Sequence, residues 1–156
     1  MKIIKLLAVS PIFLLVIACS APGPMQTQTG PINTPAFEPI VLDLVKDNSK
    51  NILFKEQYVT MYENDSRENL LGGTFFITEN GAYLAYWNVQ TFQYNITYRI
   101  KADEITKISD YTVVREYLPD SDLVVITDKD GRDIGFGIVK RNAAKYSLEK
   151  IMGKKD

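Results

Sequence analysis

The sequence FQYNITYRIK, at positions 92–101, decides the fold of this chain. Apolar and polar residues alternate along the whole stretch, as in a β-strand that packs one face on a core and turns the other to solvent. The predicted inward face consists of Phe92, Tyr94, Ile96, Tyr98 and Ile100. A slip of one residue would turn this face outward, so we expect the register of the strand to be well fixed.

More strands are predicted on the N-terminal side. Residues 72–78 and 82–88 flank Asn80-Gly81. Asn-Gly between two such runs indicates a hairpin, because both central residues of that turn need a positive φ. The preceding strand is predicted at 57–63, with a polar loop at 64–69.

The C-terminal side adds three predicted strands and then a helix. The strands are 104–114, 121–127 and 132–139, with a turn at Asp128–Gly131. The helix has one apolar stripe, made of Ala144, Leu148, Ile151 and Met152. Asn142 can cap its N-terminus, and Gly153 is placed to end it. We expect this helix to plug one open end of the sheet. The predicted fold is mainly β: a curved antiparallel sheet or partly open barrel of six or seven strands, capped by one α-helix.

Three segments of this pattern resemble the GRAM and bacterial PH-like domains: Gly73–Thr78, Ala82–Tyr86 and Tyr98–Ile108. They provide a strand led by glycine, a hairpin, and a strand ending in an Ile-x-x-x-x-Ile step. The likeness covers about residues 57–152 and implies a PH-like sheet with a closing helix. Eukaryotic relatives bind phosphoinositides through a basic first loop. Here that loop has Asp65 and Glu68 beside Arg67, so phosphoinositide binding is not expected.

The N-terminus has the layout of a secretory signal peptide. Lys2 and Lys5 come first, and the uncharged run that follows, residues 6–18, is shorter than the about 20 residues that span a bilayer. Val16-Ile17-Ala18-Cys19 resembles a bacterial lipobox. The resemblance implies that Cys19 becomes the first mature residue and carries the lipid that anchors the protein. Because Ser20 follows it rather than Asp, the outer membrane, facing the periplasm, is favoured over the inner membrane.

Composition restricts the chemistry of the mature chain. The 156 residues carry a net charge of −1, and loss of residues 1–18 removes two lysines, leaving 138 residues with side chains that sum to −3. Without a basic excess, nucleic acid is not an expected partner. The chain has no histidine and one cysteine, so the commonest metal ligands and general bases are missing. We therefore expect no metal, no cofactor and no catalysis.

Proline and glycine mark the boundary of the domain. Residues 20–39 are rich in both, which predicts a flexible tether or, alternatively, a proline-rich docking peptide. The predicted organisation is a signal peptide at 1–18, lipidated Cys19 with its tether at 19–39, and a β-domain at 40–156. Residues 40–45 suit a half-buried strand or a short helix, and Asp47-Asn48-Ser49 predicts a break.

Candidate binding residues come from an aromatic cluster between Phe75 and Tyr98. Such residues can form a partner-binding face or, more often, core and cross-strand pairs. Trp87 and Phe92, which flank a loop, are the best candidates for exposure and binding. Three aspartates around Gly131 suggest calcium, but their spacing is not that of an EF-hand, and a tight turn explains them.

We therefore expect a membrane-anchored envelope lipoprotein whose β-domain binds a protein or envelope component without catalysis. Two alternatives stay open. One is a periplasmic carrier of a small apolar ligand in a closed β-barrel, which needs an internal cavity of several hundred Å³. The other is a hydrolase that uses two carboxylates converging in a cleft.

Overall fold

The computed structural model describes residues 37–49, 51–63, 66–67, 73–88, 90–91, 93–114 and 121–152. Cys19, the predicted signal peptide and Phe92 lie outside the described residues. The predicted tether lies outside them as well, except for its last three residues, 37–39, which form the start of a helix.

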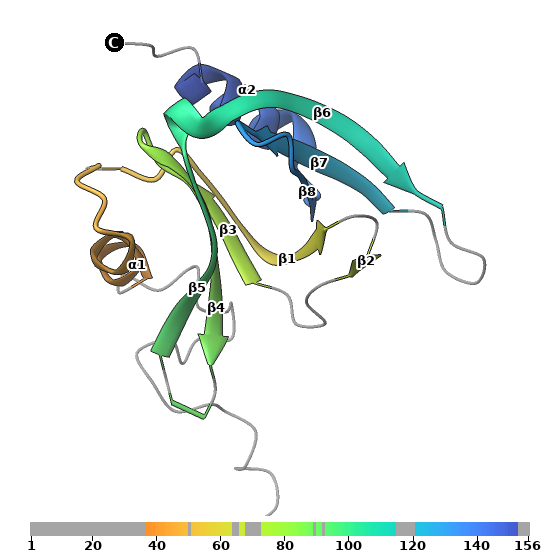
Figure 1. The fold of residues 1–156 in the computed structure, drawn as a ribbon. Coiled ribbons are helices and arrows are strands. Elements are labelled where there is room, and N and C mark those ends of the chain that lie inside the picture. The colour runs from red at the N-terminus through yellow and green to blue at the C-terminus, as the bar shows by residue number, and fades with distance from the viewer. Residues whose placement is uncertain are drawn as a thin grey trace, which may run out of the picture.

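Seven strands form one antiparallel sheet in the spatial order β5-β4-β3-β1-β8-β7-β6, and a two-residue strand pairs with β1 beside this path (Figure 1). The elements in chain order are α1 (Phe37–Val45), β1 (Phe54–Glu63), β2 (Ser66–Arg67), β3 (Gly73–Ile77), β4 (Gly81–Asn88), β5 (Gln93–Lys101), the 3₁₀ helix η2 (Ala102–Glu104), β6 (Ile105–Val113), β7 (Ser121–Asp128), β8 (Asp133–Gly137) and α2 (Arg141–Met152). The predicted mainly β class and the curved antiparallel sheet with a closing helix are confirmed. The structure adds α1, where the sequence allowed either a strand or a helix.

The sheet bends at β1. The first half of β1 pairs with β3, and its second half pairs with β8, where Thr60 lies opposite Gly137. Between Glu56 and Val59 the pairing with β3 shifts by one residue. This β-bulge bends the strand. As a result β3–β5 and β6–β8 form two arms that diverge from β1 (Figure 1).

The main core lies between the arms and under α2. Its central contact joins Phe75 and Phe136, with ring centroids 4.7 Å apart. Ala144, Leu148 and Ile151 of α2 are completely buried against it, which confirms the predicted stripe. The predicted cap is wrong: α2 begins at Arg141, so Asn142 lies inside the helix, and the Ala144 N–H donates to the Lys140 carbonyl in its first turn.

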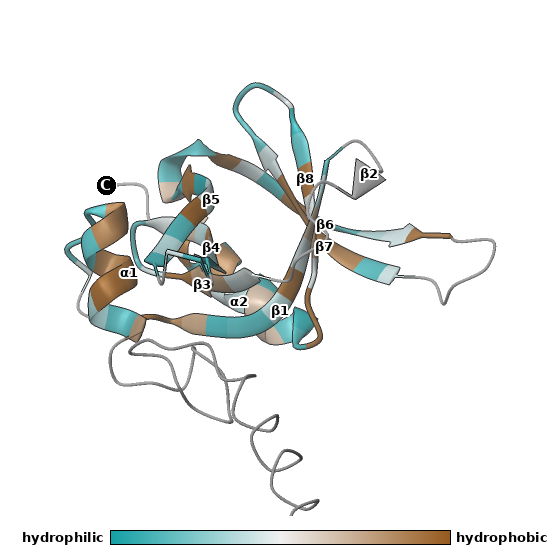
Figure 2. Cartoon of the chain, turned by 90° about the horizontal axis from the view of Figure 1, so that it is seen from below, coloured by the Kyte–Doolittle hydropathy of each residue, from teal (hydrophilic) through white to brown (hydrophobic). Residues whose placement is uncertain are grey.

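A second apolar cluster covers the other face of the β3–β5 arm. Phe37 of α1 is completely buried and packs edge-on against Phe76 and Tyr94, with centroids 5.9 and 5.3 Å away. In Figure 2 hydrophobic and hydrophilic segments alternate around α1, as an amphipathic helix requires. The helix is short, and this packing holds it in place.

Residues 93–101 form β5, and burial alternates along it as predicted, but the inward side chains do not all share one face of the sheet. Tyr98 lies opposite Leu84, while Ile96 lies opposite Ala85, so one extra residue, Thr97, interrupts the ladder. A bulge shifts the alternation of side chains by one position. Tyr94 therefore packs with the cluster under α1, while Ile100 packs in the main core.

The β3–β4 hairpin lies where Asn-Gly predicted it, for a different reason. Neither Asn80 nor Gly81 has a positive φ, because the loop closes between Thr78 and Gly81, with the Thr78 N–H donating to the Gly81 carbonyl at 2.9 Å. What Gly81 provides is space: a Cβ there would lie 2.2 Å from the carbonyl oxygen of Ile100 on β5. The turn at Asp128–Gly131 is confirmed, and Gly131 has a φ of 79°.

Candidate functional site

An open cleft of about 490 Å³ lies between β5 and the turn that joins β7 to β8. Its apolar lining comes from Met61, Tyr98, Ile100 and Ile134, on three different strands. Charged residues surround this apolar part. The cleft exists because the two arms diverge from β1 while η2 joins β5 directly to β6.

Tyr98 is the residue of the cleft with an unused polar group. Its ring packs against Phe136, with centroids 4.9 Å apart, and this contact fixes the side chain. Its hydroxyl makes no hydrogen bond within the part of the chain that the structure describes. Burial, with the Asp128 carboxylate as a smaller contribution, raises the pKa of Tyr98 above its ordinary value. The hydroxyl therefore keeps its proton and can donate a hydrogen bond to a ligand.

The turn between β7 and β8 forms the charged rim of the cleft. Oδ1 of Asp128 accepts hydrogen bonds from the N–H groups of Asp130 and Arg132, at 2.8 and 3.0 Å, and Oδ2 lies 2.7 Å from the Arg132 guanidinium. The pKa of Asp128 is lowered, first by the backbone N–H of Arg132. Asp128 thus shapes the turn, which supports the turn interpretation over the calcium loop.

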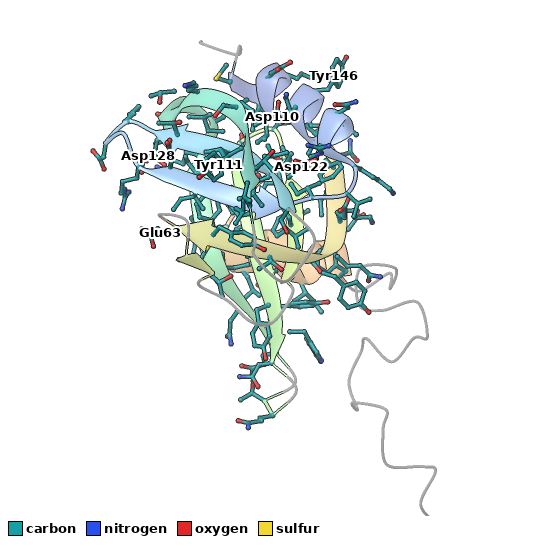
Figure 3. All side chains as sticks on the ribbon, turned by 90° about the vertical axis from the view of Figure 1, so that its right-hand side faces the viewer. Glu63, Asp110, Tyr111, Asp122, Asp128 and Tyr146 are labelled. Carbon is teal, nitrogen blue, oxygen red and sulfur yellow. The ribbon has the colours of Figure 1, made fainter. Side chains whose placement is uncertain are left out.

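Four carboxylates surround the cleft: Glu63, Glu104, Asp128 and Asp130. Figure 3 shows Glu63 and Asp128 on the same side of the molecule. Three of them have contacts that account for their positions: Asp128 binds the turn, Glu104 accepts the Lys101 N–H at 3.0 Å, and Asp130 lies 3.6 Å from the Arg132 guanidinium. A carboxylic acid that donates a proton near neutral pH needs a raised pKa. Among the described carboxylates with a resolved shift, Asp47 and Asp128, the pKa is lowered.

A second polar cluster lies at the end of α1. The carboxylate of Asp47 accepts hydrogen bonds from the Ser49 N–H at 2.8 Å, the Asn80 amide at 2.6 Å and the Tyr83 hydroxyl at 2.9 Å, and from Thr78. Burial acts to raise the pKa of Asp47, but the hydrogen bonds outweigh it and the pKa is lowered. Burial and the hydrogen bond to Asp47 raise the pKa of Tyr83 to about 12. The cluster joins α1 to the β3–β4 hairpin and has a structural role.

Trp87 is half-buried and lies opposite Tyr94 in the β4–β5 ladder, with ring centroids 4.9 Å apart. This is a cross-strand aromatic pair, which packing alone can explain. Phe75, Phe76 and Tyr83 from the same aromatic cluster are buried in the core. A binding role for Trp87 stays a prediction, and so does one for Phe92, which lies outside the described residues.

Sequence reasoning missed the cleft. The sequence predicts an inward-facing Tyr98 and a turn at 128–131, and both are confirmed, but nothing in the spacing of these residues indicates that they meet. Across the described residues, no three His, Cys, Asp or Glu side chains are grouped so that they could hold a metal ion. In the same residues, no helix has the length and apolar character needed to cross a membrane.

No protein-family model matches the chain, and no curated protein matches it in sequence. The likenesses to GRAM or PH-like domains and to lipoproteins stay predictions from the residues given above.

Proposed function

We propose that this chain is a lipid-anchored binding module of the bacterial envelope, attached through Cys19, which binds a protein or envelope component in the cleft beside β5. The anchor is supported by the order of charge, apolar run, small residue and cysteine at the N-terminus. The observation that carries the binding role is the cleft with the Tyr98 hydroxyl, which has no hydrogen-bond partner among the described residues.

The chemistry of the cleft favours a ligand with both polar and apolar groups. Met61 and Ile134 offer apolar contact, the Tyr98 hydroxyl offers a donor, and the rim has both acids and bases. Among the described strands β5 lies at one end of the sheet, so none of them pairs with its outer edge. An extended peptide supplies apolar side chains and backbone acceptors together, so it is the partner that suits this cleft best.

The two other functions receive less support. A carrier needs an enclosed cavity, whereas this cleft is open and large side chains such as Phe75, Phe136 and Leu148 pack the space under α2. A hydrolase finds several carboxylates at the cleft, but those of Asp128 and Glu104 are engaged by the backbone.

The test places a photo-crosslinking amino acid at the cleft of the full-length protein in cells. Lys129, an exposed rim residue, is the test position, and Tyr146 on α2, 70% exposed, is the control. We expect one defined adduct from position 129, none from 146, and loss of the adduct in Tyr98→Phe, which removes only the hydroxyl. Adducts that are equal at both positions, or that persist in Tyr98→Phe, would contradict binding in the cleft.

A further inference from the structure

An exposed tip lies where the bulge of β1 meets the turn between β8 and α2. Tyr58 is 73% exposed and Val139 is 90% exposed. Thr60 pairs with Gly137 in the antiparallel ladder; Tyr58 lies two residues before Thr60, and Val139 lies two residues after Gly137. Lys140 is exposed beside Val139 and makes no ion pair with any residue that the structure describes. We call Tyr58, Val139 and Lys140 the tip.

A carboxylate holds the two sides of the tip together. Glu56 on β1 accepts hydrogen bonds from the backbone N–H groups of Val139 and Lys140, at 2.5 and 3.0 Å. Glu56 and Tyr58 are two residues apart on β1, a span of roughly 7 Å along an extended strand. The hydrogen bonds of Glu56 therefore fix the turn at Val139 and Lys140 near Tyr58. The tip is a defined shape, and its apolar side chains are presented together.

The conformation of β1 at the tip is unfavourable in isolation. Tyr58 has a φ of 62°, a left-handed conformation that bulky side chains rarely adopt. Oε1 of Gln57, in the same bulge, is buried without a hydrogen-bond partner. Such strain persists where the surrounding structure imposes it, and it concentrates at functional positions. Here it results in the exposure of an aromatic ring.

The tip lies near the point where the preceding chain enters the domain. Glu38, in the first turn of α1, forms an ion pair with Lys55 of β1. Tyr58 follows three residues later, roughly 10 Å along the strand. If residues 20–36 are the flexible tether that their composition predicts, they would span about 23 Å on average. A domain attached through Cys19 would therefore stay within reach of the membrane with this side close to the attachment point.

We propose that the tip contacts the surface of the bilayer that holds Cys19, with Tyr58 and Val139 at the interface and Lys140 on an anionic lipid headgroup. Tyrosine concentrates at membrane interfaces, and lysine is attracted to anionic lipid. The proposal rests on the lipid anchor proposed above and adds an orientation. In that orientation the β1 bulge faces the membrane.

The test uses the full mature protein on vesicles of phosphatidylethanolamine and phosphatidylglycerol in equal parts. Cys19 is the only cysteine, so once lipid blocks it, Val139→Cys provides a single thiol for a nitroxide label. Tyr146→Cys, on the exposed side of α2, is the matched control. Collision with oxygen, which enters lipid, is compared with collision with a water-soluble nickel chelate.

We expect the label at position 139 to gain oxygen contact and lose nickel contact severalfold on vesicles, with no change at 146. Lys140→Glu should reduce the effect. If vesicles changed the oxygen and nickel contact of the two labels equally on a lipidated protein, the proposed membrane contact of the tip would be overturned and the proposed anchor would stand. A label immobilised at 139 before vesicles are added would indicate a protein partner or a second copy, and would also overturn it. Labelling of Cys19 in the unmutated protein would overturn the anchor and, with it, the tip.

Discussion

The Tyr83 hydroxyl of β4 donates a 2.9 Å hydrogen bond to Oδ2 of Asp47, which follows the end of α1. This contact lies at the edge of the apolar cluster in which Phe37 and Phe76 pack. It fixes the end of a helix that is too short to be stable alone. The stability of the α1 side of the molecule should therefore depend on the charge of Asp47.

Asp47→Asn is expected to lower the free energy of unfolding by about 1–3 kcal/mol at pH 7, because it weakens hydrogen bonds to a charged acceptor. The pKa of Asp47 is lowered in the folded state, so its contribution is complete above the unfolded pKa of about 3.9. It is lost as the pH falls through the lower folded pKa. Urea unfolding at a series of pH values measures this. Asp103→Asn, in an exposed ion pair, is the control and should change little. A deficit in Asp47→Asn that did not shrink toward acid pH would contradict this account.

Lys46→Gly is expected to stabilise the protein by about 0.5–1 kcal/mol. Lys46 directly follows α1 and has a φ of 55°, and the N–H groups of Lys46 and Asp47 donate to the carbonyls of Asp43 and Leu42. This is a Schellman motif, in which glycine normally occupies the left-handed position. Lys46→Ala keeps the unfavourable φ and should bring no such gain. If the alanine variant were as stable as the glycine variant in thermal unfolding, backbone strain at Lys46 would not be the cause.

Gly81→Ala is expected to destabilise the protein by about 2–3 kcal/mol, because the new Cβ collides with the backbone of β5. Gly131→Asn is the informative comparison. No atom lies within 4 Å of a Cβ at Gly131, and asparagine tolerates its φ of 79° better than most residues. The second variant should therefore cost less than about 1 kcal/mol. If both variants lost the same free energy of unfolding in chemical denaturation, the close approach of β5 would not explain why glycine is needed at position 81.

Glu56→Gln is expected to destabilise the protein by about 1–2 kcal/mol, since a neutral amide accepts the Val139 and Lys140 N–H groups less strongly than a carboxylate. Hydrogen exchange at these two amides should accelerate before exchange in the core of α2. Glu149→Gln, exposed on the same helix, provides a control of equal charge change. Unchanged exchange at Val139 and Lys140 would show that Glu56 does not hold this turn.

The sequence predicted the elements of this fold better than their contacts. Alternation and the Asp128–Gly131 turn located β5, β7 and β8 because these signals are local. The bulge at Thr97 escaped prediction because an extra residue in a ladder is defined by its partner strand, here Leu84 and Ala85 of β4. The residues around it alternate without interruption in the sequence.

The cleft and the tip were unpredictable for a related reason. Tyr98 and Asp128 come together only because β1 bends and divides the sheet into two arms. Tyr58 belongs to an alternating stretch that suggests an ordinary strand, and nothing in that stretch reveals its positive φ. Glu56 is more than 80 residues away in sequence from Val139 and Lys140, so its role also depends on tertiary structure.

The most direct test of the central claim is mass analysis of the N-terminal peptide of the protein made in a bacterial host, with and without globomycin. The account predicts a mature chain that begins at Cys19 with diacylglycerol on its sulfur, and a precursor that accumulates when the signal peptidase is inhibited. A chain that retains Met1 and an unmodified Cys19 in both samples would contradict it.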